Sequence, residues 1–576
     1  MARVVVIGAG IAGLATAALL ARDGHEVEIL ERGSRVGGRA GWIDDAGFRF
    51  DTGPSWYLMA EVFEHYAELL GTSIEQMIDL EVLDGYTILA GDSAPSANEG
   101  AAGDPPPTID RLDVPRGEDA VAALAESLEP GAGEEMRRYL ASARSALTIS
   151  LAEFLYNPFT AVPDISSARL RGATRDLVRW LSTSLARWSN ARFEHPLLRQ
   201  MLQYNAIFLG VDPRRAPAIY HLMSHIDLVE GVRYPKGGFT AFVHALHERA
   251  LAEGVRITLN AEVTEILAAR RRGPALPVGK RGEVRGVVWS DESGVEHRTR
   301  ADVVVSAADM HHTETQLLAP DLQTWPERAW DHSVPGPSSV LVMLGVEGEL
   351  PTLPHHTLLL TRDWEVGLDA VFLGSETPET TSLYVCKPSA SDDGVAPAGS
   401  ENLFLLVPVS GEIGLGSGTG YPTGDSASEK AGAREVDPAV ERIADLAIEQ
   451  VARWADVPDL ADRITVRHTL GPADFGADYH SWRDGMLGPS HVLRQSAMFR
   501  RGPASRKVDG LYYAGATTVP GVGVPMCLIS AELVLKSLRG DSSAGPLPLD
   551  EAPGAGQPAA GAVRSAGSAG IAGAAR

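Results

Sequence analysis

Long apolar runs are missing from this sequence of 576 residues. No stretch reaches the roughly 18 to 20 unbroken apolar residues that a membrane-spanning helix needs. The N-terminus also lacks the order of a signal peptide, in which a charged region precedes an apolar region and a cleavage site. We therefore expect a protein that is soluble or attached to a membrane from one side.

Cysteine and positive charge are scarce as well. The two cysteines, Cys386 and Cys527, lie far apart, which excludes a disulfide framework and a zinc quartet and fits a reducing cytoplasm. Lys and Arg number 51 against 75 Asp and Glu, a net charge of −24, so bulk charge does not favour nucleic acid as a partner. Hydrophobic residues at 44% and charged residues at 22% are ordinary for a globular protein.

The N-terminal residues have the pattern of a strand–helix–strand unit. Residues 3–7 (RVVVI) favour a buried strand, 14–22 a helix, and 26–30 (EVEIL) a second strand that ends at Glu31. The sequence GAGIAG at 8–13 stands between the first strand and the helix. A GxGxxG turn in this context is typical of dinucleotide binding, and the alternative is a glycine-rich turn without a ligand.

Each residue of this unit has a physical role in dinucleotide binding. Gly8 permits the tight turn, Gly10 lets the backbone approach a pyrophosphate, and Gly13 lets the helix pack closely on the strand. The helix N-terminus offers free N–H groups and the positive end of its dipole. Glu31 can accept a hydrogen bond from a ribose hydroxyl.

Two later segments extend the pattern. Residues 35–39 (RVGGR) would bring a second glycine pair and a cation to the same diphosphate. Residues 48–54 (FRFDTGP) predict an aromatic strand that enters a tight turn. With the N-terminal unit, these segments resemble the flavin amine oxidase and phytoene desaturase superfamily. The resemblance implies that the dinucleotide is FAD and not a nicotinamide.

The C-terminal region contains a second strand–loop–helix unit. Residues 511–514 predict a strand, 515–525 a loop of Gly and Pro, and 526–538 a helix. This order would place a helix N-terminus against an electron-rich group, and a plain connection is the alternative. The run AGATTVPGVGVP at 514–525 resembles the C-terminal signature of bacterial carotenoid desaturases, in particular phytoene desaturase.

Central segments support this resemblance in the same order along the chain, from residue 3 to residue 540. Residues 231–239 precede a predicted helix and resemble the strand-to-helix entry of the family. Residues 254–263 resemble the strand pair that contributes Val263 to the adenosine end, and 301–307 resemble the strand that returns to the flavin domain.

The implied fold class is α/β: a doubly wound, Rossmann-like FAD-binding domain of discontinuous segments, plus a mixed α/β region for substrate and membrane docking. Three hydrophilic insertions, 91–107, 270–282 and 411–434, are expected to be surface loops. In chain order we expect an FAD-binding segment at 1–90, a low-complexity surface loop at 91–107, a substrate and membrane-associating region at 108–230, the second FAD-binding segment at 231–310, a substrate domain at 311–505, the last FAD-binding segment at 506–540 and a disordered tail at 541–576.

The motifs and the resemblance together imply a set of cofactor-binding residues, and the sequence identifies no catalytic acid or base. No metal site is predicted, because His244 and His247 lack both the HExxH pattern and a third ligand. The pairs His311–His312 and His355–His356 are expected on the surface, and Cys527 is expected to be a small buried residue near the flavin. The cofactor-binding residues are Gly8, Gly10, Ala12, Gly13, Glu31, Arg32, Gly38, Arg39, Gly53, Pro54, Val263, Gly515, Gly523 and Met526.

The resemblance implies an FAD-dependent phytoene desaturase, which inserts double bonds into a C40 polyene on the way to lycopene. Removing hydrogen from an unactivated CH₂–CH₂ unit needs a stronger acceptor than a nicotinamide, which favours a flavin. The alternatives are a carotenoid isomerase, a ketolase, a desaturase of another carotenoid, a flavin amine oxidase, or a flavoprotein without turnover. The terminal electron acceptor, quinone or oxygen, stays open.

Residues 170–200 predict an amphipathic helix. Arg175 and Arg179 occupy the face opposite the apolar one, which suits a headgroup interface, and packing on the protein core is the alternative. Because a C40 hydrocarbon is confined to the bilayer, we expect a cytoplasmic protein that contacts the inner face of the cell membrane peripherally. The apolar face consists of Leu177, Trp180, Leu181, Leu185 and Trp188.

Overall fold

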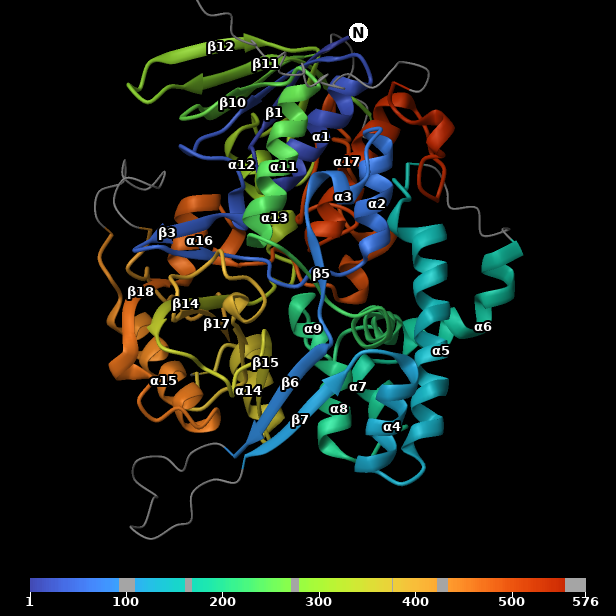
Figure 1. The fold of residues 1–576 in the computed structure, drawn as a ribbon. Coiled ribbons are helices and arrows are strands. Elements are labelled where there is room, and N and C mark those ends of the chain that lie inside the picture. The colour runs from blue at the N-terminus through green and yellow to red at the C-terminus, as the bar shows by residue number, and fades with distance from the viewer. Residues whose placement is uncertain (93–108, 161–167, 271–278, 376, 422–433, 555–576) are drawn as a thin grey trace, which may run out of the picture.

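The structure is a computed structural model that describes residues 1–92, 109–160, 168–270, 279–375, 377–421 and 434–554 (Figure 1). Its upper part in Figure 1 is built on a five-stranded sheet in the order β20-β13-β1-β2-β9, in which every neighbouring pair is parallel. Segments far apart in the sequence therefore form one sheet, which confirms the predicted α/β fold of discontinuous segments. The strands are β1 (Arg3–Ile7), β2 (Glu26–Leu30), β9 (Arg256–Thr258), β13 (Val303–Ser306) and β20 (Leu511–Tyr513).

Helices cover one face of this sheet, and a second small sheet covers the other. Helix α1 (Ile11–Arg22) is buried from Ile11 to Leu20 and packs against α11 (Gly238–Ala252) and α17 (Val524–Arg539). Its small alanine side chains allow this close packing on both neighbours. The covering sheet consists of β10 (Glu262–Arg270), β11 (Gly282–Ser290), β12 (Glu296–Arg300) and β19 (Val508–Asp509).

A seven-stranded sheet forms the second layer of the molecule, in the order β18-β14-β17-β16-β15-β6-β7. Helix α15 (Pro438–Trp454) packs on β14, β17 and β18, and α14 (Trp364–Leu373) packs on β15 and β17. The strands are β6 (Gly85–Gly91), β7 (Asp110–Pro115), β14 (Ser338–Glu347), β15 (His356–Thr361), β16 (Leu383–Cys386), β17 (Ser400–Val409) and β18 (Ile464–Leu470).

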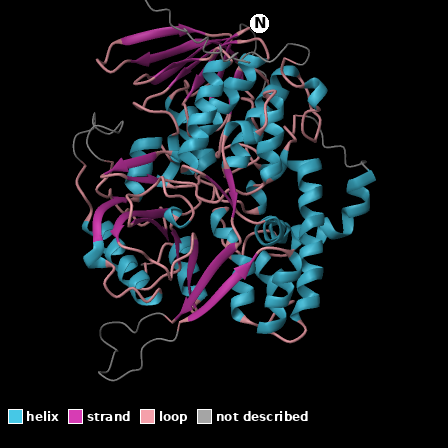
Figure 2. Ribbon diagram, viewed as in Figure 1, coloured by secondary structure: helices cyan, strands magenta, loops and turns pink. Residues whose placement is uncertain are grey.

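A group of helices lies beside this sheet, on the right of Figure 2. Within the described ranges, no helix combines the length and apolar character required to cross a bilayer. The group contains α4 (Glu118–Leu128), α5 (Ala132–Ser150), α6 (Ala168–Ser182), α7 (Leu185–Asn190), α8 (Pro196–Gln203), α9 (Asn205–Phe208) and α10 (Leu222–His225). Shorter elements elsewhere are β3 (Trp42–Asp45), β4 (Phe48–Asp51), β5 (Leu80–Val82), β8 (Arg233–Pro235), α2 (Ala60–Leu69), α3 (Ile74–Met77), α12 (Met310–Gln316), α13 (Glu327–Trp330) and α16 (Pro472–Tyr479).

The amphipathic segment at 170–200 differs from the helix expected at a membrane interface. It divides into α6 and α7 at Ser184, whose hydroxyl accepts a hydrogen bond from the Arg187 backbone N–H and caps α7. Trp180 and Trp188 are only 2% and 7% exposed and both pack against the His221 ring. Placing these tryptophans at a membrane interface is therefore wrong, and the alternative of packing on the core holds.

The start of the predicted disordered tail is packed onto the protein. The Lys536 ammonium donates to the carbonyls of Ser543 and Gly545 at 2.7 Å each. Leu547 is 2% exposed, and its N–H donates to the Glu532 carboxylate. The buried Lys536 ammonium needs carbonyl acceptors and therefore fixes the chain just beyond α17. The rest of the predicted tail, 555–576, lies outside the described residues.

The predicted insertion at 411–434 also differs from a simple surface loop. Its first part, 411–421, packs against β18 and α16, and the Gly418 N–H donates to the Asp474 carboxylate. A Cβ on Gly418 would lie 2.3 Å from the Thr469 carbonyl oxygen, so only glycine fits there. Residues 422–433, and most of the other two insertions (93–108 and 271–278), lie outside the described residues.

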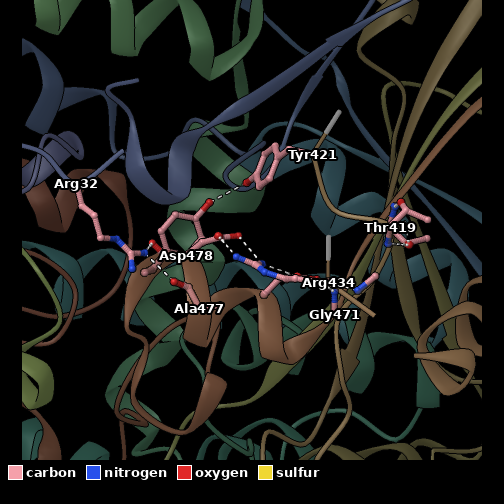
Figure 3. A network of polar contacts seen from close by, with 11 residues as sticks. Arg32, Thr419, Tyr421, Arg434, Gly471, Ala477 and Asp478 are labelled. Atoms are coloured by element: carbon pink, nitrogen blue, oxygen red, sulfur yellow. Dashed lines mark hydrogen bonds and ion pairs between the residues drawn. The ribbon is translucent and has the colours of Figure 1, made fainter. Parts of the chain in front are cut away.

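Figure 3 shows the polar network that holds this segment in place. The Arg434 guanidinium binds the carboxylates of Asp474 at 2.7 Å and Asp478 at 2.5 Å. The side chains of both aspartates are at most 8% exposed. The Tyr421 hydroxyl lies 2.8 Å from the Tyr479 hydroxyl. One arginine thus neutralises two buried carboxylates of α16.

We expect Arg434→Met to destabilise the protein, because it leaves two nearly buried carboxylates without a cation. Loss of one partner of a buried pair costs about 3–5 kcal/mol. The measurement is the thermal unfolding midpoint of the flavin-loaded protein. The matched control is Arg442→Met, since Arg442 pairs with Glu379 on the surface and such pairs contribute about 1 kcal/mol or less. Equal midpoints for the two variants would contradict this role of Arg434.

Candidate functional site

One cavity of about 680 Å³ extends between the two layers of the molecule. At one end it is lined by the turn between β1 and α1 and by residues 30–42. At the other it reaches Trp56, Tyr384 and the strands of the seven-stranded sheet. All of the predicted cofactor-binding residues except Gly13 line this cavity. The structure therefore brings together residues that stand more than five hundred positions apart in the sequence, from Gly8 to Met526.

The β1–α1 turn has the backbone geometry that a dinucleotide requires. Gly8 has φ of +97°, in the left-handed region that glycine adopts without strain. A Cβ on Gly13 would lie 1.9 Å from the Gly8 carbonyl oxygen, so Gly13 acts in helix–strand packing. A Cβ on Gly10 would meet no described protein atom closer than 3.8 Å and would extend into ligand space. The arrangement thus leaves room for a diphosphate at the N-terminus of α1.

Glu31 connects the turn to the second strand. Its carboxylate oxygens accept hydrogen bonds from the backbone N–H groups of Ala9 at 2.6 Å and Gly33 at 2.7 Å. Each carboxylate oxygen has two acceptor positions, so one remains on each oxygen for a ribose hydroxyl. Val263 is buried at the same end of the cavity. These contacts fit an adenosine ribose between Glu31 and Val263.

The second glycine segment closes against the first. The Gly37 N–H donates to the Ala9 carbonyl at 2.9 Å, so residues 37–39 run beside the β1–α1 turn. A Cβ on Gly38 would lie 3.2 Å from the Gly10 Cα, and Gly38 has φ of +57°. A Cβ on Gly53 would lie 2.1 Å from the Arg39 carbonyl oxygen. Backbone therefore packs on backbone here, and Pro54 follows along the cavity wall.

Two of the three arginines at this part of the cavity, Arg32 and Arg39, have different partners. The Arg32 guanidinium donates to the carbonyls of Ala477 and Asp478 at the end of α16. The Arg39 guanidinium donates to the Ser481 hydroxyl at 2.7 Å and lies 3.8 Å from the Asp309 carboxylate. Burial raises the pKa of Asp309, and the nearby Arg39 cation opposes that rise. Arg39 thus places a cation beside the buried Asp309 carboxylate at the cavity wall.

The C-terminal loop reaches the middle of the cavity, as its sequence predicts. Gly515 and Gly523 have φ of +102° and +118°, and Gly523 is the N-cap of α17. Pro525 stands in the first turn of α17, where its missing N–H costs nothing. Met526 and Cys527 line the same wall, and Cys527 is only half-buried. The first turn of α17 thus presents backbone to the cavity between its two ends.

The far end of the cavity is apolar. Leu341 and Leu406 of the seven-stranded sheet face Phe208, Met223 and Met486 of other segments across it. Sequence reasoning missed these residues, because no local motif marks side chains that meet only in the folded chain. Two polar residues at this end, Ser55 and Tyr384, hydrogen-bond to each other at 2.9 Å.

The predicted positions of the histidine pairs are wrong in part. His355 and His356 are 5% and 0% exposed and lie in the core beside β16. His312 is half-buried, lines the cavity and stacks on His480 with ring centroids 3.9 Å apart. The pairs were expected on the surface because adjacent histidines share no helical face. At the start of β15, however, both histidines of one pair are buried.

The family model of flavin containing amine oxidoreductases matches residues 11–534. The chain therefore belongs to this family, and its two flavin motifs stand near the ends of the matched region. Carotenoid 3,4-desaturase of Haloarcula japonica is 35% identical over 539 residues, which cover 93% of this chain and 98% of the relative. The zeta-carotene-forming phytoene desaturase of Myxococcus xanthus is 30% identical over 544 residues, with 93% of each chain covered.

Solved structures with the same fold include putrescine oxidase bound to putrescine, with a TM-score of 0.55 and 15% identity over 93% of this chain and 99% of the other. An oxidoreductase from Methanosarcina mazei also has a TM-score of 0.55, with 16% identity over 93% of this chain and all of the other. The comparisons confirm the predicted resemblance to carotenoid desaturases. The chain is an FAD-dependent oxidoreductase acting on CH–CH groups. The individual cofactor-binding residues and the domain boundaries stay predictions.

We expect Gly10→Val to abolish flavin binding, because the added side chain would occupy the space left for the diphosphate. The measurement is the flavin absorbance per chain of the purified variant. The control is Gly172→Val, since a Cβ on Gly172 would meet no described atom within 4 Å, so this variant should keep the wild-type flavin content. Full flavin retention by Gly10→Val would place the diphosphate elsewhere.

Proposed function

We propose that the chain desaturates a carotenoid, with phytoene as substrate and products on the way to lycopene. The observation that carries this proposal is a single cavity that joins the β1–α1 turn to an apolar chamber. Bound at this turn, FAD supplies a hydride acceptor for a CH–CH unit of the substrate. The likeness to the Haloarcula japonica carotenoid 3,4-desaturase, at 35% identity, favours desaturation of a different carotenoid as a second candidate.

The residues of the chain would then bind and orient two molecules, the FAD cofactor and the polyene substrate. The turn at Gly10, the carboxylate of Glu31 and the charge of Arg39 would hold the dinucleotide. The apolar chamber would hold the polyene by burial of its hydrocarbon surface and would exclude water from the reacting carbons. The first turn of α17 lies between the two, where its free N–H groups would favour negative charge on the flavin ring.

Exposed apolar side chains surround the opening of the chamber. Leu181 of α6 is 38% exposed, and Leu493, Met498 and Phe499 are 40%, 45% and 61% exposed. All four also line the cavity. Exposed apolar groups at a cavity that takes hydrocarbon suit contact with a bilayer. We therefore place the proposed peripheral membrane contact at this apolar rim, instead of at Trp180 and Trp188.

The test of the function is expression in bacteria that accumulate phytoene, followed by analysis of the pigments formed. We expect desaturated products from the wild type. Gly523→Val should retain FAD and yet convert phytoene roughly 100-fold more slowly, because displacement of reacting groups by about 1 Å has that effect. A second strain that accumulates a more desaturated carotenoid tests the alternative substrate.

Gly540→Val is the matched control for Gly523→Val. Gly540 caps the other end of α17 with φ of +72°, so the control carries similar backbone strain, but a Cβ there meets no described atom within 4 Å. If Gly523→Val converts phytoene at the wild-type rate, the first turn of α17 is not part of the reaction centre. Lack of any pigment change by the wild type in both strains, with flavin bound, would refute carotenoid desaturation.

The apolar rim predicts how the protein binds membranes. The double variant Met498→Ser/Phe499→Ser should bind liposomes roughly 100-fold more weakly, since it removes about 3 kcal/mol of apolar burial. The control is Val366→Ser/Leu373→Ser on α14, where the residues are 47% and 63% exposed but do not line the cavity. Flotation with liposomes measures both. Equal flotation of the two double variants would contradict the apolar rim as the membrane contact.

A further inference from the structure

Three side chains with soft or borderline metal-binding atoms meet in the core behind the apolar chamber. His355, His356 and Cys386 are 5%, 0% and 1% exposed. One ring nitrogen from each histidine and the cysteine sulfur all lie within 4.8 Å of one another. None of these residues belongs to the flavin motifs, and none lines the cavity. The cluster therefore needs an explanation apart from the redox reaction.

The strand register explains why these side chains meet. His356 and Cys386 are direct partners on the antiparallel strands β15 and β16, so their side chains project from the same face of the sheet. His355 stands just before β15, and its ring centroid lies 4.5 Å from that of His356. Two neighbouring strands thus fix His356 and Cys386, and the residue just before β15 adds His355.

The hydrogen bonds around the imidazole rings match those of metal ligands. The Nδ1 atom of His355 lies 3.0 Å from the Ser391 hydroxyl, and that of His356 lies 2.7 Å from the Tyr384 hydroxyl. The Nε2 atom of each ring is buried and has no hydrogen-bond partner among the described residues. Histidines that bind metals have this pattern: one nitrogen hydrogen-bonds to oxygen, and the other is left for the metal.

The unpartnered nitrogens also suit a cation, because each buried Nε2 atom has no hydrogen-bond partner among the described residues. Leaving buried polar groups unpaired costs about 1–3 kcal/mol each, and a bound metal would remove that cost.

We propose that Nε2 of His355, Nε2 of His356 and Sγ of Cys386 bind one thiophilic d¹⁰ cation, Zn²⁺ or Cu⁺. Thiolate and imidazole are the ligands that these ions prefer. Binding forms two metal–nitrogen bonds and one metal–sulfur bond and releases the thiol proton to solvent, with no change of oxidation state. Tetrahedral Zn²⁺ with bonds of about 2.0–2.3 Å places its ligand atoms about 3.3–3.8 Å apart, so these atoms need to approach one another by up to about 1.5 Å.

The bound metal would join β15 to β16 and, through His356, fix the Tyr384 hydroxyl at the chamber wall. Its role is therefore structural, and it does not depend on which carotenoid the enzyme accepts. The fourth position on Zn²⁺ would be open, whereas Cu⁺ is satisfied by three ligands. Metal analysis after loading with each ion separates the two.

The test starts from the FAD-loaded protein, loaded with Zn²⁺ or, without oxygen, with Cu⁺, and then freed of unbound metal. We expect one metal ion per chain by elemental analysis, and X-ray absorption at the metal edge should show sulfur and nitrogen ligands. Tyr384→Phe should weaken the affinity about 10- to 100-fold, as loss of a partner of a metal-bound histidine does. Cys386→Ala should abolish stoichiometric binding.

The matched control is Cys527→Ala, which removes the other cysteine and should keep one metal ion per chain. Flavin content reports whether each variant folds. If Cys386→Ala does not fold, the X-ray absorption spectrum of the wild type decides alone. No bound metal in the wild type, equal binding by a folded Cys386→Ala variant, or a bound metal without a sulfur ligand would each overturn the proposal.

Discussion

The contact between the end of β1 and the start of α1 is the constraint on which the rest of the structure depends. A Cβ on Gly13 would lie 1.9 Å from the Gly8 carbonyl oxygen, so helix and strand touch through their backbones. This contact fixes the direction of α1, which is buried between α11 and α17. Because the N-terminus of α17 borders the same cavity, α1 also sets the distance between the diphosphate end and the middle of the site.

The parts that the sequence predicts correctly are those in which backbone geometry decides the structure. The turn at Gly8, the Gly/Pro loop before the last helix and the strand β13 each depend on a short run of residues whose chemistry leaves few alternatives. A glycine in such a turn or loop indicates either a positive φ or the close approach of another backbone segment. Thirteen of the fourteen predicted residues line one cavity, although hundreds of residues separate them.

The parts that the sequence does not predict depend on side chains from distant segments. Helical periodicity finds the apolar face with Trp180 and Trp188, but it cannot distinguish a core partner such as His221 from lipid. The hydrophilic character of 411–434 made this insertion resemble a surface loop, although Gly418 meets the backbone at Thr469. Two adjacent histidines at 355–356 become core residues because β15 begins there and pairs with β16 on one side and β6 on the other.

One histidine of the cavity wall has a structural role beside the C-terminal loop. His491 lines the cavity, and burial holds its pKa well below the usual value, so the ring stays neutral. Its Nε2 atom accepts from the Val522 N–H at 3.3 Å, which leaves the proton on Nδ1, 2.9 Å from the Tyr220 hydroxyl. Nε2 thus holds the C-terminal loop, and Nδ1 is occupied by Tyr220. This lining suits the proposed function, in which a long apolar substrate is positioned beside a flavin.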